Sequence, residues 1–218
     1  MNGTQARVVV LAGPSGSGKS RLARRLGWPV LRLDDFYRDG DAADLPYIDD
    51  ELVDWDDPRS WDAEAACEAI ERLCTDGQVD APVYDLAANA CVSRREVSLD
   101  GADVVIAEGI FAPYVVAGCR DRGLLAAALC IRHPRLVTYA LRLTRDLREH
   151  RKPPQVLVRR GLALLRAEPT VVRRAVDMGC EPMSPRRAER RLRRLLSAPS
   201  SHPTLSPRSR PSASHGPA

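Results

Sequence analysis

Long apolar runs, paired cysteines and internal repeats are all missing from this sequence. No apolar run approaches the roughly 18 residues of a membrane-spanning helix, and the chain does not open with a signal-peptide pattern, so we expect a cytoplasmic protein that does not act in a membrane. The six cysteines form no C-x-x-C pair, which argues against a zinc site and a disulfide framework. With 218 residues, 44% of them hydrophobic, the chain can bury the core of one α/β domain and little more.

Lysine is also scarce, because only Lys19 and Lys152 are lysines among 33 basic residues. Lys19 stands in G-P-S-G-S-G-K-S at residues 13–20, between an apolar run and a helical stretch. A glycine-rich turn in this context points its N–H groups at a phosphate, and a compact lysine charge fits beside it. The sequence therefore predicts a phosphate-binding loop rather than a turn that binds nothing. The predicted ATP-binding residues of this loop are Gly13, Ser15, Gly16, Ser17, Gly18, Lys19 and Ser20, the last also a magnesium ligand.

Acids and bases are segregated along the chain. Residues 34–64 hold thirteen acids and two arginines, whereas residues 135–194 hold seventeen bases and six acids. The basic stretch has no interleaved aromatics, so it fits a lid that meets triphosphate better than a nucleic-acid surface. Solvated helix faces are the plainer explanation for many of these charges.

Strand-like and helix-like segments alternate, which predicts a three-layer α/β fold of the P-loop NTPase type with a mostly parallel sheet. The expected strands are 8–12, 29–33, 103–107 and 125–131. The expected helices are 18–26, 62–74, 134 to about 150, and parts of 156–166 and 185–196. We expect a small substrate hairpin within 78–99, and prolines 169, 182 and 185 to interrupt the later helices, which would cover the adenine or pack the sheet edge.

These segments define one expected catalytic domain, residues 1–197, with substrate-binding loops at about 34–99 and an arginine-rich helical lid at about 142–155. Residues 198–218 are rich in serine and proline, with almost nothing to bury, so we expect a disordered tail.

Acidic residues follow two of the predicted strands. Asp34 and Asp35 come after the second strand, and Glu108 ends the strand at 103–107. Ligands of open α/β sheets bind beyond the carboxyl ends of the strands, so both aspartates should face the crevice of the phosphate loop. A carboxylate there can accept the proton of an attacking hydroxyl, and Asp34 and Glu108 are candidate magnesium ligands. A turn or N-cap role remains open for one of the aspartates, as does an exposed turn position for Glu108.

Taken in order, these segments resemble the uridine kinase family, within the wider group that includes phosphoribulokinase and bacterial pantothenate kinase. The resemblance covers about residues 8–152. It rests on the phosphate loop, D-D-F-Y-R at 34–38, D-W-D-D-P-R-S-W-D at 54–62, P-V-Y-D at 82–85, E-G-I-F at 108–111 and the arginine-rich 142–152.

The resemblance implies a role for single residues. The family's catalytic base falls on Asp34 rather than Asp35, its ribose-binding aspartate on Asp56, and its base-contacting tyrosine on Tyr84. The other substrate-binding candidates are Tyr37 and Asn89. The lid arginines fall on Arg142 and Arg145, the second being catalytic, and Arg151 and Lys152 stand near the later phosphate contacts. This sequence departs from the family pattern at Leu86 and Asn89, where the family usually carries phenylalanine and histidine.

The resemblance thus implies ATP- and Mg²⁺-dependent phosphorylation of the 5′-hydroxyl of a nucleoside, as in pyrimidine salvage. The crowded acids around the acceptor independently favour an uncharged polyol such as ribose. Two alternatives stay open: a related kinase of pantothenate or a sugar phosphate, and a nucleotide-dependent regulatory or nucleic-acid-binding ATPase. The small-molecule acceptor is the expected partner, and assembly into a homo-oligomer is left open.

Overall fold

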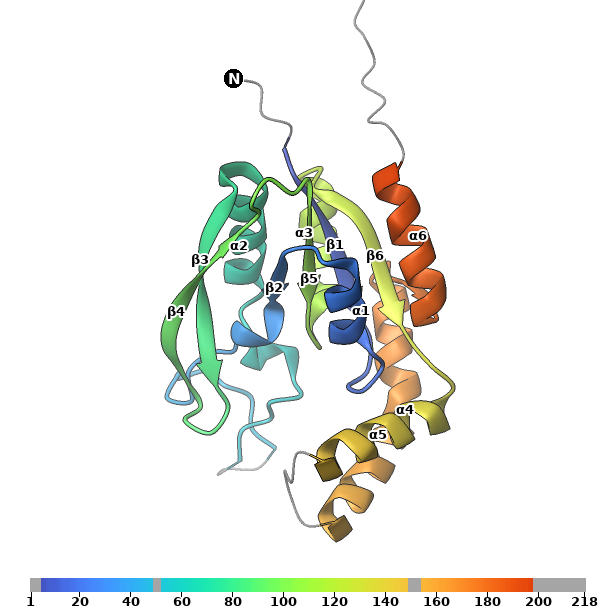
Figure 1. Cartoon of the computed structure of the whole chain (residues 1–218). Helices are drawn as coiled ribbons and strands as arrows, with labels where there is room; N and C mark the ends of the chain where they lie inside the picture. Colours follow the sequence, from blue (N-terminus) through green and yellow to red (C-terminus); the bar gives the residue numbers. More distant parts are fainter. Residues whose placement is uncertain (1–4, 49–51, 149–153, 198–218) are drawn as a thin grey trace, which may run out of the picture.

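A parallel five-stranded sheet forms the centre of the molecule, with strand order β2-β5-β1-β6-β7 (Figure 1). The computed structural model describes residues 5–48, 52–148 and 154–197. The strands are β1 (Arg7–Ala12), β2 (Val30–Arg32), β5 (Val104–Glu108), β6 (Leu125–Ile131) and β7 (Glu181–Met183). The first four are the predicted strands, within one or two residues at each end.

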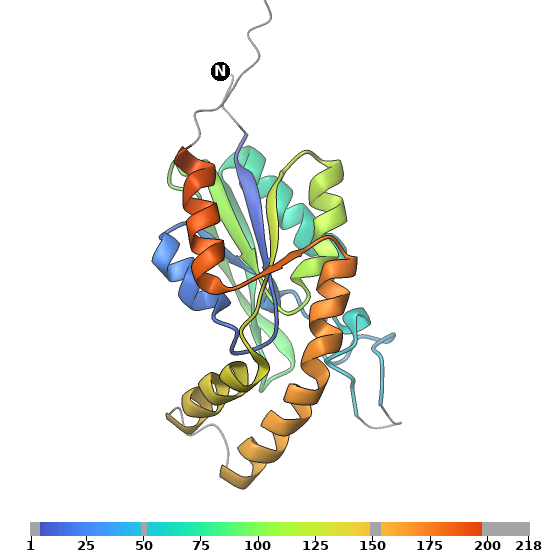
Figure 2. The same cartoon turned by 90° about the vertical axis from the view of Figure 1, so that its right-hand side faces the viewer.

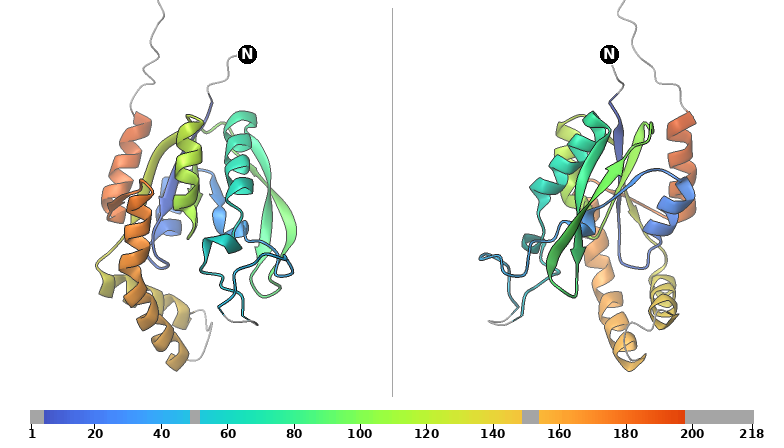
Figure 3. Two further views of the ribbon diagram at one scale, coloured as in Figure 1. Left: turned by 180° about the vertical axis from the view of Figure 1, so that it is seen from behind. Right: turned by 60° about the vertical axis from the view of Figure 1, so that its left-hand side comes forward.

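Helices cover both faces of this sheet, because its central strands are apolar on both sides. On β1, Val9 and Leu11 pack with α1 (Lys19–Leu26) and α6 (Pro185–Ser197), whereas Val8 and Val10 belong to the core on the other face. That second core includes α2 (Ala63–Asp76) and α3 (Val116–Asp121). Figure 3 shows the two helical layers and confirms the predicted α/β fold.

Two elements extend from the body. The antiparallel hairpin of β3 (Gln78–Asp85) and β4 (Ala90–Ser98) confirms the predicted hairpin. The packed helices α4 (Arg135–Arg148) and α5 (Pro154–Asp177) reach past the carboxyl edge of the sheet, and we call this pair the arm (Figure 2). Short 3₁₀ turns η1 (Leu33–Asp35), η2 (Pro58–Ser60) and η3 (Ala112–Val115) complete the described elements.

The expectation that three prolines interrupt the later helices is wrong. Pro169 lies inside α5, Pro182 lies in the edge strand β7, and Pro185 is the first residue of α6. An interior proline costs a helix about 3 kcal/mol, but α5 packs on α4 before it and on β6 and β7 after it, and this packing keeps the helix continuous. The C-terminal chain therefore adds a strand to the sheet edge.

Part of the predicted lid and the whole predicted tail, residues 149–153 and 198–218, lie outside the described residues. None of the helices in the described ranges has both the length and the apolar composition needed to cross a bilayer.

Candidate active site

Three neighbouring strands end at the residues that the sequence singles out. β5 pairs with β1 and with β2, and its last residue, Glu108, is level with Leu11 and Arg32. Because the strands are parallel, the chain leaves all three at the same edge of the sheet. The phosphate loop, the turn η1 and the end of β5 are therefore brought together at this edge, as predicted.

The phosphate loop is bent by left-handed glycines. Gly13, Gly16 and Gly18 have φ values of +131°, +82° and +92°, where a side chain would be strained. A Cβ atom at Gly13 would also overlap the carbonyl oxygen of Ile131 at the end of β6. Gly18 is the N-cap of α1, so the loop leads into the positive end of a helix. This concavity is suited to an anion such as phosphate.

The polar side chains of the loop surround its backbone. Lys19 Nζ donates to the carbonyl oxygens of Gly13 at 2.7 Å and Pro14 at 3.4 Å, so its charge lies over the loop. Ser15 is exposed, whereas Ser17 is fully buried and its Oγ finds no hydrogen-bond partner within the described chain. A buried hydroxyl without a partner is uncommon, and it is a group that a bound phosphate can satisfy.

Oxygen donors suited to magnesium lie beside the loop. Ser20 Oγ donates to Glu108 Oε2 at 3.1 Å. The exposed Asp34 accepts a hydrogen bond from Ile110 N at 2.7 Å, which fixes its carboxylate against the end of β5. Over the described ranges no cluster of three or more His, Cys, Asp or Glu side chains is poised to hold a metal. Magnesium is usually held by one or two carboxylates and the substrate phosphates, so this donor set fits it.

The expectation that Asp35 faces the crevice is wrong. Its side chain is buried, with 5% exposure, and its Oδ2 lies 3.6 Å from Arg32 Nε. Burial raises the pKa of Asp35, against the opposing effects of Arg32, Arg95 and a hydrogen bond from the backbone of Tyr84. Asp35 therefore ties η1 to the hairpin, and of the two aspartates only Asp34 is open to solvent.

The loop before η2 carries the aspartates of the predicted acceptor site. Asp57 caps η2 and pairs with Arg59 at 2.9 Å, and Asp54 accepts a hydrogen bond from the backbone of Asp56. Asp56 itself is exposed. Burial raises the pKa of Tyr37, and the carboxylates of Asp34 and Asp56 raise it further, so both charges lie near this ring.

An aromatic cluster, which the sequence analysis missed, fills the space behind these carboxylates. Six of the ten aromatic residues belong to it, in ring contacts of 5.6–6.3 Å between centroids: Tyr37, Trp55, Trp61, Tyr84, Phe111 and Tyr114. Every motif quoted for the acceptor side contributes at least one ring. The signal was available, since a chain with few aromatics carries most of them in these motifs, but the ring contacts join residues up to 74 positions apart (Tyr37 to Phe111).

The predicted base-contacting residues differ in exposure. Tyr84 is 92% buried (8% exposed), and its hydroxyl donates to the carbonyl oxygen of Arg38 at 3.0 Å. Asn89 is exposed at the hairpin turn with φ +50°, and its carbonyl oxygen accepts from Gly40 N at 2.7 Å. Leu86 is 72% exposed. Tyr84 thus offers its ring rather than its hydroxyl, and Asn89 closes the hairpin against the loop at Gly40.

The predicted lid residues lie on or beyond α4. Arg142 and Arg145 belong to this helix, but the structure describes only their backbone. Arg151 and Lys152 lie outside the described residues. The roles predicted for these four side chains stay predictions.

The sequence of this chain is similar to those of known proteins. Residues 8–153 match the Phosphoribulokinase / Uridine kinase family. The chain is 30% identical to the uridine kinase of Shewanella piezotolerans over 160 residues, 68% of this chain and 73% of that one. It is 28% identical to the uridine kinase of Geobacillus kaustophilus over 171 residues, 75% and 78% of the two chains.

A solved structure shares the fold. A protein from Silicibacter sp. TM1040, named as a candidate fructose transport system kinase, has a TM-score of 0.56 and 21% identity over 79% of this chain and 86% of its own. The chain belongs to the phosphoribulokinase/uridine kinase family and is a P-loop kinase that uses ATP and acts on an alcohol group.

Proposed function

We propose that this chain phosphorylates the 5′-hydroxyl of a nucleoside, with Asp34 as the base. The observation that carries the proposal is the position of Asp34. Its exposed carboxylate is fixed by Ile110 N at 2.7 Å, on the strand end next to the one that carries Glu108. Tyr37, whose ring lies near both Asp34 and Asp56, connects this carboxylate to the aromatic cluster.

The reaction is an in-line displacement. Asp34 accepts the proton of the acceptor hydroxyl, whose oxygen attacks the γ-phosphorus of ATP while the bond to the β,γ-bridging oxygen breaks and ADP leaves. Lys19 and the loop N–H groups of residues 13–20 hold the β and γ oxygens, and Arg145 stabilises the charge of the transferred group. Ser20, Glu108 and Asp34 would hold magnesium, which when bound would neutralise phosphate charge. Arg142, Arg151 and Lys152 complete the contacts to ATP.

Two features support a nucleoside as the acceptor. Asp56 is exposed near Tyr37 and can accept hydrogen bonds from a pair of ribose hydroxyls. The rings of Tyr37, Trp55 and Tyr84 form an apolar wall that suits a flat base. Relatives at 28–30% identity are named uridine kinases. Leu86 has no ring that could stack on the base, and the side-chain amide of Asn89 can both donate and accept hydrogen bonds. We therefore expect weak discrimination between uridine and cytidine.

The test is a panel of acceptors in an ATP-consumption assay, with product identified by mass. We expect uridine and cytidine to be used with similar kcat/KM, and 2′-deoxy and 3′-deoxy nucleosides to be rejected by a large factor, because a site built to bind a hydroxyl rejects analogues that lack it. The Asp56→Asn variant should reduce this discrimination. Equal use of deoxynucleosides contradicts the role of Asp56, and phosphorylation of pantothenate or a sugar phosphate alone contradicts the nucleoside acceptor.

A further inference from the structure

Trp61 is a buried residue whose polar atom is directed at the segment that carries Asp34. It lies between η2 and α2, and its side chain is 4% exposed. The indole Nε1 donates to the carbonyl oxygen of Leu33, the first residue of η1, at 2.7 Å. A buried indole N–H usually has a hydrogen-bond partner, and here the partner belongs to the residue immediately before Asp34.

The carbonyl oxygen of Leu33 accepts a second hydrogen bond, from Phe36 N at 3.2 Å, which closes the turn η1. A carbonyl oxygen has two lone pairs, so both bonds can form at once. The longer of the two belongs to the 3₁₀ turn, in which hydrogen-bond geometry is poor. The shorter bond from Trp61 is therefore the stronger restraint on this carbonyl group.

The orientation of the Leu33 carbonyl group determines where Asp34 points. The carbonyl carbon and oxygen of Leu33 share one rigid peptide plane with the nitrogen and Cα of Asp34. Fixing the oxygen thus fixes the start of the Asp34 side chain. At the other end of that side chain, Oδ1 is held by Ile110 N at 2.7 Å. The catalytic carboxylate is therefore restrained both through its backbone and through its own oxygen.

Trp61 also connects Asp34 to the loop that carries Asp56. This loop ends in η2, directly before Trp61. An antiparallel bridge pairs Trp61 with Tyr37, three residues after Asp34. Trp61 thus holds the segment of Asp34 twice, with its backbone at Tyr37 and with its side chain at Leu33. The relative position of the two carboxylates depends on both contacts.

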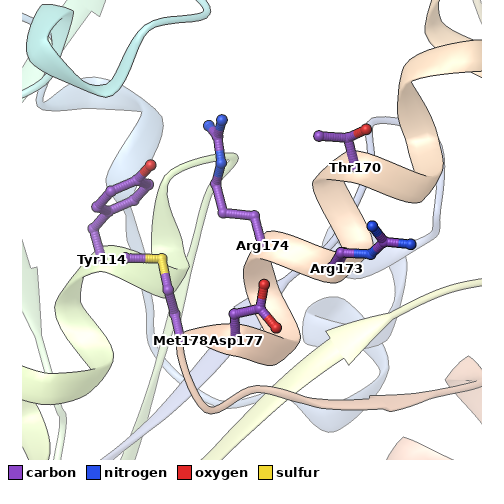
Figure 4. A pocket seen from close by; sticks show the side chains of 6 residues that line it. All are labelled: Tyr114, Thr170, Arg173, Arg174, Asp177 and Met178. Atoms are coloured by element: carbon purple, nitrogen blue, oxygen red, sulfur yellow. The ribbon is translucent and has the colours of Figure 1, made fainter.

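The ring of Trp61 has a separate role in packing. It contacts Phe111 at 5.7 Å between centroids, and Phe111 contacts Tyr114 at 6.0 Å. Tyr114 ends this row of rings, where it lines a pocket of about 450 Å³ together with residues of α5 such as Met178 (Figure 4). The packing of the Trp61 ring and its hydrogen bond to Leu33 can therefore be changed separately.

We propose that Trp61 is a positioning residue for the transfer step, whose indole N–H orients Asp34 toward the acceptor hydroxyl by fixing the Leu33 carbonyl group. This role rests on the proposed function, in which Asp34 is the base. Because Trp61 acts through Leu33 and leaves the phosphate loop unchanged, loss of its N–H should lower kcat and leave the KM for ATP almost unchanged.

The test is steady-state kinetics of two variants that remove the N–H group, with ATP and uridine, or the alcohol that the acceptor panel identifies. Trp61→Phe keeps a ring beside Phe111. β-(3-Benzothienyl)alanine at position 61 keeps the bicyclic shape of tryptophan, with sulfur in place of the N–H. We expect both to lower kcat about tenfold or more, the usual cost of a misplaced catalytic group. The isostere retains the packing, so it reports on the hydrogen bond even if Trp61→Phe folds poorly.

Two controls make similar changes elsewhere. Trp28→Phe is the same substitution at a half-buried position that packs against the core on the other face of the sheet. Tyr114→Phe removes a hydroxyl from the same row of rings and keeps the ring beside Phe111. Both controls should keep kcat near that of the wild type.

A double-mutant cycle distinguishes positioning from general destabilisation. In the Asp34→Asn background, loss of the N–H at position 61 should have almost no further effect on kcat, because the base that it positions is gone. A merely structural role lowers kcat by the same factor in both backgrounds. Unchanged kcat in the isostere, or an equal loss in the two backgrounds, overturns the role of Trp61 alone. Full turnover in Asp34→Asn would overturn the proposed base as well.

Discussion

At the scale of single residues, two adjacent aspartates have opposite surroundings. Asp34 is exposed and Asp35 is buried, because η1 is a 3₁₀ turn in which consecutive side chains point about 120° apart. Only one of them can face the cleft. The family motif favours Asp34 as the base. The burial of Asp35 indicates a structural role for that residue.

We predict that Asp34→Asn lowers kcat by about a hundredfold or more, the usual contribution of a general base, with little change in ATP affinity. Asp35→Asn should keep most of the turnover, because the buried amide can still accept the hydrogen bond from the Tyr84 backbone. Steady-state kinetics and the melting temperature of both variants test this. A larger loss of kcat in Asp35→Asn would contradict the assignment.

The buried carboxyl also predicts a pH dependence. Because the pKa of Asp35 is raised in the folded state, the folded chain binds this proton more tightly than the unfolded chain. As the pH falls through the raised pKa toward the ordinary value of about 3.9, this proton uptake stabilises the fold. We therefore expect the melting temperature of Asp35→Asn to decline more than that of the wild type as the pH is lowered toward this ordinary value. Parallel curves would show that Asp35 does not titrate there.

At the scale of elements, the site depends on how closely η1 approaches the end of β5. A Cβ atom at Gly109 would lie 2.8 Å from Asp34 Oδ1 and 2.9 Å from Leu33 Cβ. Real side chains do not tolerate such distances, so glycine here lets the two strand ends meet.

Gly109→Ala should consequently push Asp34 away from Ile110 N and lower kcat by about tenfold or more, since small misplacements of a catalytic group are costly. Gly118→Ala is a matched control, because its Cβ would meet Cys67 Sγ and Arg122 Nη1 at 3.0 Å in a part of the fold away from the cleft. Its kcat should stay near that of the wild type. Equal kcat values in the two variants would show that the close approach at Gly109 does not affect the catalytic step.

The arm provides the second prediction at this scale. We expect Arg145→Ala on α4 to lower kcat by about a hundredfold while the Kd of the acceptor is unchanged, since an arginine on the transferred phosphate acts in the transition state. Arg166→Ala, at an exposed position of α5, is the control. Calorimetry with the acceptor distinguishes a role at the transferred phosphate from a role in acceptor binding. A loss of acceptor affinity alone would indicate that Arg145 binds the acceptor.

At the scale of the whole molecule, nucleotide binding should stabilise the fold. A ligand at a hundred times its Kd adds about 2.7 kcal/mol, which for a domain of this size raises the melting temperature by roughly 5–10 °C. We expect this shift with ATP and magnesium for the wild type and a much smaller one for Lys19→Ala, with equal melting temperatures in the absence of nucleotide. An undiminished shift would show that Lys19 does not contact the phosphates.

The sequence was sufficient to predict the strands whose apolar runs are long, such as β6, and to predict that the motifs follow them. It did not predict β7, because Glu-Pro-Met is short, contains a proline and pairs on one side only. Local patterns placed Asp34 and Asp35 at the right strand end, but Asp35 is buried and accepts a hydrogen bond from the backbone of Tyr84, about fifty positions away. The aromatic cluster is likewise built from contacts between distant segments.

At Gly13 the phosphate loop lies directly against the end of β6. Gly13 has no room for even one added carbon against Ile131, the last residue of β6. Arg132 N is held by the carbonyl oxygen of Met183 at 3.0 Å, and α4 starts three residues later. The phosphate loop and the start of α4 are thus both fixed at the end of β6, so a side chain added at Gly13 should also displace the chain that leads into α4.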